Sequence, residues 1–503
     1  MSVDAVVAGW LTVLVPALPF GAALLIGIGL FTGGTAGERS ERSVAQVAGA
    51  ASLGVFMLVL VLDGLALAGE APRQVSLGTW FAAAGLDVEV SFLLDRTALG
   101  MATVTAVLGG LVVRFCRAYL HRETGFHRFY MTLCLFLSGM LLLALAGNAV
   151  LAFVGWELCG LASYLLIGYN RERPAATENA TFAFLSNRVG DGGFLLSIGL
   201  AVWWLQSVEW PVVVALHPDP VTARMLAFGL VVAALVKSAQ VPFSAWIARA
   251  LEGPTPSSAV FYGSVMVHAG VFLVIRLEPL LRQVPDLMVG LALAGFATSV
   301  YAYLVGLTQS DVKSSLLYGT LGQTGLMFLA CGLGAFDLAA VHLVAHAVWR
   351  AYQFLLAPSW LALMPAPDVP APGWLRKRRQ LYVAALQRFW LDNLALSLLA
   401  RPTQALGRDM ARLDGEVLDR LAGAGGPGGD DPERAATGVP GRMLASLAQR
   451  LQRFEDRLLT GSQGGTVGKA TGRVLRALAL VESLLEQPRY LMLMVMATFV
   501  VIL

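Results

Sequence analysis

Long apolar runs separated by short polar segments fill most of the chain. A helix that crosses a bilayer needs about 20 predominantly apolar residues, and about twelve of the runs approach that length. The predicted spans are 8–31, 44–69, 93–116, 129–148, 149–169, 178–206, 221–246, 256–277, 286–307, 312–334, 337–363 and 487–503. The pattern therefore predicts an all-α polytopic membrane protein with about 12 transmembrane helices.

Two regions depart from this pattern. In QVSLGTWFAAAGLDVEVSFLLD (residues 74–95), apolar and polar positions alternate around a glycine-containing turn, which predicts a small β-hairpin outside the membrane. After residue 365, a proline-broken linker leads to two stretches with an amphipathic helical pattern, 380–422 and 442–459, the first interrupted at Pro402. These stretches predict an amphipathic C-terminal tail.

The chain is thus predicted to have four parts. They are N-terminal membrane helices (1–75), a membrane core (76–365), a linker with amphipathic lateral helices (366–486) and a C-terminal anchoring helix (487–503).

Arginine residues mark every second loop. They occur after the first, third and fifth predicted spans, whereas the intervening loops are poorer in positive charge. Positively charged short loops face the cytoplasm. The N-terminus is therefore expected outside the membrane and the tail region 366–486 on the cytoplasmic side.

Composition agrees with a membrane protein and excludes several functions. Hydrophobic residues make up 57% of the chain and charged residues 14%, whereas soluble proteins carry about 25% charged residues. A net charge of +3 gives no reason to expect nucleic-acid binding. The four cysteines stand singly in apolar runs and have no metal-ligand spacing. No nucleotide, flavin, iron–sulfur or zinc motif is present, so we expect no cofactor, no metal and no self-contained catalytic site.

Ionisable residues inside the predicted spans are the candidate functional groups, because a charge at the bilayer centre costs at least about 2.5–3.5 kcal/mol. Glu157 lies near the middle of the fifth span, where it either binds protons or pairs with a neighbouring helix for assembly. Arg188 and Asp191 in the sixth span are three residues apart and share a helix face. They form either an internal ion pair or part of a functional site.

Lys237 lies at mid-membrane in the seventh span, and Pro242 follows five residues later. Proline removes a backbone hydrogen bond and clashes with the carbonyl four residues back, here that of Ser238. We therefore predict that the helix breaks just after the lysine, as in transporter ion sites. A buried lysine loses its proton easily, which makes Lys237 a candidate proton carrier.

His342, His346 and Arg350 are spaced four residues apart in HLVAHAVWR. Four residues advance about 400°, so the three side chains form one gently winding stripe. Histidine suits proton relay because it titrates near neutral pH. Two histidines four apart can also bind zinc, but HLVAH lacks the glutamate of HExxH and no third ligand follows. Arginine keeps its proton, so Arg350 sets a positive potential or blocks a leak.

Three further groups complete the set. His268 in the eighth span is either a hydrogen-bonded core residue or a functional one. Asp311 and Lys313 open the tenth span and lie either at the interface or inside the bundle. The expected proton path is Glu157, Lys237, Lys313, His342 and His346, with Arg188, Asp191, His268, Asp311 and Arg350 in charge pairing or gating. Titratable lysine and histidine favour protons, because a sodium site would be rich in oxygen ligands.

Several of these motifs, in order and at matching intervals, resemble one superfamily. It comprises the antiporter-like subunits of respiratory complex I (subunit L above all), the Mrp cation/proton antiporters and the membrane subunit of the DAB inorganic-carbon pumps. The resemblance covers roughly residues 75–360 and is carried by GWELCGLASYLLIGY, NRVGD, LVKSAQVPFSAWIARALEGPTPSSA, SDVKSSLLYGTLGQTGLMFLACG and HLVAHAVWRAYQFL.

The resemblance implies two inverted five-helix units with broken helices, and proton conduction through a glutamate–lysine pair and a central polar axis. Glu157 matches the family glutamate and Lys237 its partner lysine. Arg188 and Asp191 match the RVGD motif, Asp311 and Lys313 the DxK segment, and His342 and His346 the paired histidines.

The sequence also departs from this family pattern. Arg350 stands where the family usually has lysine, and Tyr262 where it usually has histidine. The proline linker follows the histidine helix almost at once, so the second half-channel is expected to be truncated.

The resemblance implies a multi-pass protein of a bacterial inner membrane that conducts protons and couples their flux to protein partners. A DAB-type inorganic-carbon uptake system with a zinc-containing soluble partner is the preferred case. The alternatives are a distal pumping subunit of a complex I-like or hydrogenase assembly, and a scaffold that no longer conducts.

Overall fold

The computed structural model describes residues 3–32, 38–83, 86–217, 219–363 and 370–412. The chain forms two compact units, Met1–Ala395 and Leu396–Leu503. In the described ranges the secondary structure is helical except for two strands, as predicted. The predicted amphipathic stretch 442–459 and the predicted span 487–503 lie outside the described residues.

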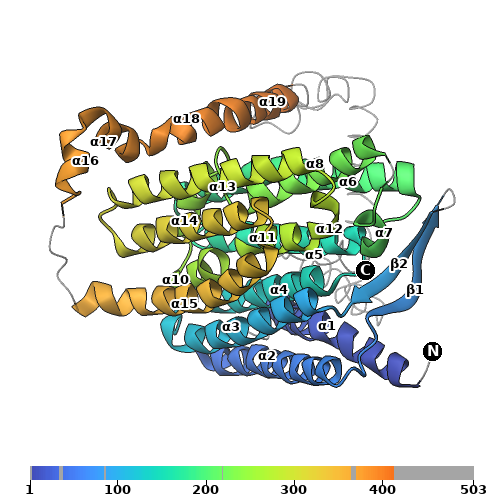
Figure 1. Cartoon of the computed structure of the whole chain (residues 1–503). Helices are drawn as coiled ribbons and strands as arrows, with labels where there is room; N and C mark the ends of the chain where they lie inside the picture. The colour runs from blue at the N-terminus through green and yellow to red at the C-terminus, as the bar shows by residue number, and fades with distance from the viewer. Residues whose placement is uncertain (1–2, 33–37, 84–85, 218, 364–369, 413–503) are drawn as a thin grey trace, which may run out of the picture. The chain divides into compact units, whose positions relative to one another are not determined.

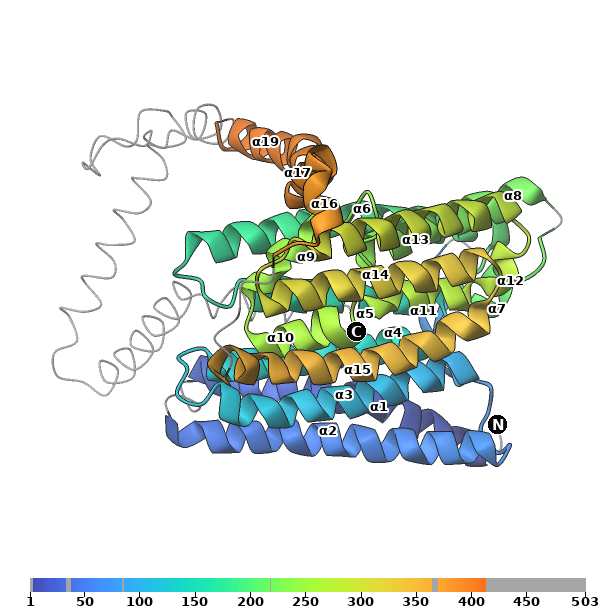
Figure 2. The same cartoon turned by 60° about the vertical axis from the view of Figure 1, so that its left-hand side comes forward.

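Eight helices in the described ranges are long and apolar enough to cross a membrane. They lie in α1 (Val3–Thr32), α2 (Glu38–Leu67), α3 (Arg96–Tyr119), α4 (Phe126–Leu145), α5 (Ala149–Ile167), α8 (Pro220–Lys237), the segment Thr255–Arg276 and α13 (Pro285–Gly306). Three more long helices are α6 (Pro174–Leu205), α14 (Val312–Gly332) and α15 (Phe336–Leu363). Figures 1 and 2 show these helices side by side in one bundle. A multi-pass membrane fold is thus confirmed, and the number of 12 spans stays a prediction.

Short elements interrupt or join the long helices. Within Thr255–Arg276, α10 (Thr255–Ser258) is followed by a π-helical segment, η2 (Ala259–Ser264), and then by α11 (His268–Arg276). The other short elements of this unit are α7 (Trp210–Val213), α9 (Ala245–Arg249), η1 (Ala250–Glu252), α12 (Glu278–Leu281), α16 (Gly373–Lys377), α17 (Arg379–Leu386), η3 (Arg388–Trp390) and α18 (Leu391–Ala395).

Helix α4 lies at the centre of the bundle, and nearly all of its side chains are buried. It packs against α1, α3 and α5. Its contact with α5 depends on two facing glycines: a Cβ on Gly155 would lie 2.6 Å from the carbonyl oxygen of Gly139. Only glycine permits this approach, which brings α5 and its Glu157 against the core.

The predicted hairpin is present as β1 (Gln74–Ala83) paired antiparallel with β2 (Leu86–Leu93), and Figure 1 shows it at one end of the bundle. Its buried Leu86 and Val88 pack with Val208, which follows α6. Asn148, the N-cap of α5, donates hydrogen bonds to the backbone oxygen of Glu89 (2.7 Å) and to the Glu209 carboxylate (3.1 Å). The hairpin is therefore tied to the helix ends beneath it.

The tail helices differ from prediction in one respect. An interruption that was not predicted occurs within 380–422 at η3, where Arg388, Phe389 and Trp390 all have positive φ. In the second unit, η4 (Leu396–Ala400) precedes α19 (Arg401–Arg412). Pro402 is the second residue of α19, which directly follows the π-helical η4.

Candidate functional site

An arginine on α6 joins two carboxylates. Arg188 Nη2 lies 2.7 Å from Glu157 Oε2 on α5 and 2.9 Å from Asp191 Oδ2 on α6. Asp191 also accepts a hydrogen bond from the indole Nε1 of Trp156 at 2.8 Å. The predicted Arg188–Asp191 pair is therefore present, and it extends to the neighbouring helix instead of staying within one helix.

Close packing of α6 on α8 places Arg188 and Asp191 of α6 near Lys237 of α8. A Cβ on Gly229 of α8 would collide with the backbone oxygen of Gly193 and with the Ser197 hydroxyl of α6. Ser197 Oγ donates to the Leu226 carbonyl of α8 at 2.8 Å. A larger residue at Gly229 would push the two helices apart, so the glycine is needed for this geometry.

Helix α8 ends at Lys237, as the position of Pro242 predicted. The lysine is buried, with 1% of its surface exposed. Its Nζ donates to the backbone oxygen of Trp156 at 3.2 Å and lies 4.7 Å from the centre of the indole ring. Lys237 is not in salt-bridge contact with Glu157. The two residues of the pair that the family resemblance implied are joined through Trp156, Asp191 and Arg188.

The chain after the break is held by polar groups of other helices. Ser238 Oγ donates to the Val267 carbonyl at 2.6 Å. Gln240 Nε2 contacts Thr324 Oγ1 of α14 at 3.2 Å, and the Val241 N–H donates to Thr298 Oγ1 of α13 at 3.0 Å. The backbone groups freed by the break are thus partly satisfied inside the bundle, as they must be away from water.

A second cluster gathers the histidines. His268 Nε2 and His346 Nδ1 are 3.0 Å apart, and His342 Nε2 and Gln323 Oε1 of α14 are 2.8 Å apart. Arg350 Nε points to His346 Nε2 at 3.4 Å. The stripe predicted on α15 therefore faces the bundle, and His268 of α11 joins it.

Gln240 and Thr324 contact each other, and each is close in the chain to one of the two clusters. Gln240 follows Lys237 by three residues, and its contact Thr324 neighbours Gln323, the partner of His342. Among the described residues, Oε1 of Glu157 and Oε1 of Gln240 are buried side-chain oxygens without a hydrogen-bond partner. Polar groups thus extend from α5 to α15 through the interior.

Asp311 and Lys313 lie elsewhere. Asp311 is the N-cap of α14, and its carboxylate accepts from the Ser314 N–H at 2.8 Å. Lys313 Nζ contacts the backbone oxygens of Leu251 and Gly253 at 3.3 and 3.2 Å. No hydrogen bond or ion pair joins either residue to the two clusters among the described residues. Their contacts are those of helix termini.

Sequence reasoning missed four residues of this network: Trp156, Gln240, Gln323 and Thr324. The available signal was uncharged polar side chains inside apolar helices, in SAQVPF and LGQTG. Tyr262, at the position where the family usually has histidine, donates to the Ala250 carbonyl at 3.0 Å. In the described part of the chain, no group of three His, Cys, Asp or Glu side chains could hold a metal ion.

Two family models match the chain. One, described as "NADH:quinone oxidoreductase/Mrp antiporter, TM", matches residues 146–400. The other, described as "NADH-Ubiquinone oxidoreductase (complex I), chain 5 N-terminus", matches residues 80–130. The first model spans both clusters.

Curated proteins that are similar to this chain agree with the family models. NAD(P)H-quinone oxidoreductase subunit 5, organellar chromatophore 1, of Paulinella chromatophora is 35% identical over 383 residues, which are 72% of this chain and 57% of the relative. NADH-quinone oxidoreductase subunit L of Neisseria meningitidis is 35% identical over 366 residues, which are 69% of this chain and 53% of the relative. The chain thus spans about half the length of the curated relatives it matches.

The structure of the Mrp complex from Dietzia sp. DQ12-45-1b contains a chain with the same fold. Its TM-score is 0.61 at 22% identity, and the match covers 97% of this chain and 62% of that chain. The family model and the curated relatives show that the protein belongs to the NADH:quinone oxidoreductase/Mrp antiporter family of membrane subunits.

Proposed function

We propose that this chain conducts protons through the membrane as one subunit of a larger complex. The observation that carries the proposal is the polar network inside the bundle, which runs from the half-buried Glu157 and Arg188 to the buried Asp191, Trp156 and Lys237. Burying charges in a membrane bundle is costly, so such networks in membrane proteins usually serve transport.

Each group has a role that follows from its chemistry. Glu157, Lys237 and the histidines exchange protons, whereas Arg188 and Arg350 keep theirs and act as fixed positive charges. Arg188 contacts both carboxylates, so protonation of one alters the electrostatic environment of the other. One charge crossing the membrane exchanges about 2.3 kcal/mol per 100 mV, which is the energy available for coupling.

The partner is proposed from the relatives. The two curated relatives named above are subunits of quinone oxidoreductases, which favours a complex I-like assembly over the inorganic-carbon system expected from the sequence. Neither the preferred inorganic-carbon system nor its zinc-containing soluble partner gains support from these relatives. We therefore place the chain as a proton-pumping subunit driven by chemistry elsewhere in such a complex.

The proposed location is a bacterial inner membrane, with the hairpin end of the bundle outside. Four arginines between α3 and α6 lie in or beside the loops at the end of the bundle away from the hairpin: Arg122, Arg128, Arg171 and Arg173. Such positively charged loops favour the cytoplasmic side.

Replacement of Lys237 with alanine in the assembled complex tests conduction. Proton flux into membrane vesicles, followed with a pH-sensitive dye, should fall by roughly tenfold or more, because a proton-transfer group is lost. Lys377→Ala is the matched control, since Lys377 is an exposed lysine on α16. Unchanged flux through a normally assembled Lys237→Ala complex would support the scaffold alternative instead.

Purification of the tagged chain in mild detergent tests the partner. Quinone-binding and iron–sulfur subunits in the eluate would support the complex I-like assembly. A soluble zinc-containing protein in their place would overturn that choice and restore the inorganic-carbon system.

A further inference from the structure

Helices α2 and α3 form a groove that the proton network does not use. It has a volume of about 470 Å³ and continues, past Arg114 and Arg117, into a second hollow of about 830 Å³ at the end of the helices. On α2 the lining residues recur every three or four positions, from Arg42 through Ala45, Gly49 and Ser52 to Phe56. The groove therefore runs along the helix axes.

The groove is apolar along its length and basic at its mouth. Ala106, Val107, Gly110 and Leu111 of α3 line the apolar part, and Leu53 and Leu111 there are exposed on the outside of the bundle. Arg42, Arg114 and Arg117 line the mouth, and all three are exposed. Among the described residues, none of the three arginines forms an ion pair or donates a side-chain hydrogen bond.

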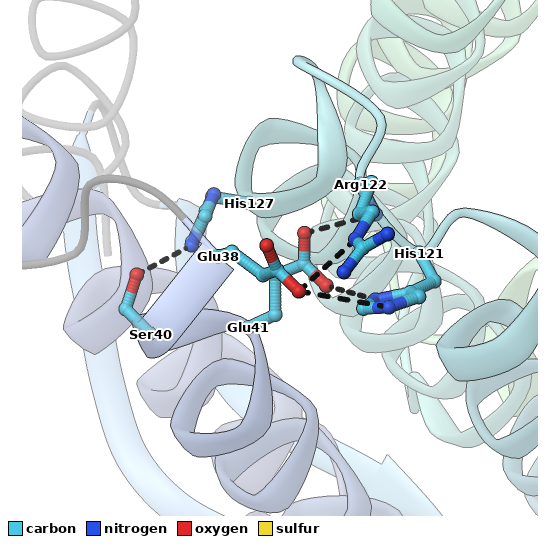
Figure 3. A network of polar contacts seen from close by, with 6 residues as sticks. All are labelled: Glu38, Ser40, Glu41, His121, Arg122 and His127. Atoms are coloured by element: carbon cyan, nitrogen blue, oxygen red, sulfur yellow. Dashed lines mark hydrogen bonds and ion pairs between the residues drawn. The ribbon is translucent and has the colours of Figure 1, made fainter.

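The two carboxylates in the mouth are already paired. Glu41 Oε2 lies 2.8 Å from His121 Nδ1, and its Oε1 accepts from the Arg122 N–H at 3.1 Å. Glu38 Oε1 lies 3.0 Å from Arg122 Nε. Figure 3 shows both carboxylates turned to His121 and Arg122 of the turn between α3 and α4. The three arginines thus keep their positive charge for another partner.

We propose that this groove binds an anionic phospholipid. The lipid phosphate contacts Arg42, Arg114 and Arg117, and an acyl chain lies between α2 and α3. Guanidinium groups match phosphate oxygens in geometry and charge, and basic pockets between membrane helices suit anionic headgroups. The apolar walls and the exposed position in the bundle fit an acyl chain rather than a soluble anion.

Native mass spectrometry of the full-length chain tests this site. The purified chain is mixed with equal amounts of phosphatidylglycerol and phosphatidylcholine, and retained lipids are counted. The wild type should retain phosphatidylglycerol preferentially. The double variant Arg114→Gln/Arg117→Gln should weaken that preference by roughly tenfold or more, since each arginine near an anionic lipid contributes substantially to binding. Arg171→Gln, a loop arginine outside the groove, should keep it.

A second pair of variants tests the acyl-chain groove without changing charge. A Cβ at Gly49 or at Gly64 of α2 meets no atom within 4 Å, and only Gly49 lines the groove. Gly49→Leu should reduce retention of phosphatidylglycerol, and Gly64→Leu should not.

Three results would overturn the proposal: equal retention of the two lipids by the wild type, an unchanged preference in the double arginine variant, or an equal loss in Arg171→Gln. If the double arginine variant fails to fold, as judged by gel filtration and circular dichroism, the two glycine variants decide the outcome.

Discussion

Arg188 Nη2 lies 2.7 Å from Oε2 of Glu157 on the neighbouring helix, and this contact is the direct ion pair of the glutamate. The same nitrogen lies 2.9 Å from Asp191. One guanidinium therefore balances two carboxylates, and Lys237 contacts Trp156, whose indole donates to Asp191.

Replacement of Arg188 with glutamine should leave Glu157 and Asp191 without their shared cation. A buried ion pair that loses one partner costs about 3–5 kcal/mol and an exposed pair at most about 1. The Arg188 side chain is 36% exposed and that of Glu157 is 22% exposed, so we expect a loss of about 1–3 kcal/mol. Unfolding of the wild type and of the glutamine variant in detergent measures this loss of stability. Arg188→Lys should be intermediate, and equal stability of the glutamine variant and the wild type would contradict the structural role.

Gly229→Ala should separate α6 from α8. The added methyl collides with the Gly193 backbone oxygen and the Ser197 hydroxyl, and overpacking of this kind costs about 1–3 kcal/mol. Gly199→Ala is the matched control on α6, because a Cβ there meets no atom within 4 Å. The measurements are thermal unfolding and proton flux, and both should fall in the first variant only.

His268 and His346 should show energetic coupling, since their ring nitrogens are 3.0 Å apart. A double-mutant cycle with leucine at each position should give an interaction energy of about 0.5–3 kcal/mol in unfolding. The same cycle between His268 and His217, which contacts Val213 and Gln283 instead, should be additive. Additivity in the first cycle would show that the contact contributes nothing.

Glu209 should make hairpin stability depend on pH. Burial raises the pKa of this carboxyl above its ordinary value of 4.5, although Ser91 and Asn148 oppose the shift by donating hydrogen bonds. Because the folded-state pKa is raised, its stabilising contribution is complete below the unfolded value and is lost as pH rises through the folded value. The stability of the wild type relative to Glu209→Gln should therefore decrease with rising pH. The test is to measure the unfolding temperatures of the wild type and of Glu209→Gln from below the unfolded-state pKa to above the folded-state pKa. A difference between the two that stays constant with pH would refute the effect.

Much of the fold follows from local rules that the sequence displays. The hairpin was predicted from alternation, and the end of α8 was predicted from Pro242, because both depend on residues close in the chain. The π segment η2 could not be predicted in this way. It lies in a buried stretch that packs against α15, so tertiary packing decides its geometry.

The charged residues of the candidate site were predicted from the sequence, but the contacts that join them were not. Charges in apolar spans stand out by their cost, which identified Glu157, Lys237 and the histidines. The placement of Trp156 between Lys237 and Asp191 depends on how α5, α6 and α8 pack. Asp311 shows a limit of this reasoning. In the sequence alone, a carboxylate that caps a helix start looks the same as a carboxylate with a role in transport.

Asn148 links α5 to the hairpin, and this link has a practical consequence. It caps α5, the helix that carries Glu157. It also contacts Glu89 of the hairpin and Glu209, which accepts a hydrogen bond from Ser91 of the hairpin. An axial displacement of α5 would pull on these anchors, so a fluorophore or spin label on the hairpin would report from the solvent on events deep in the bundle.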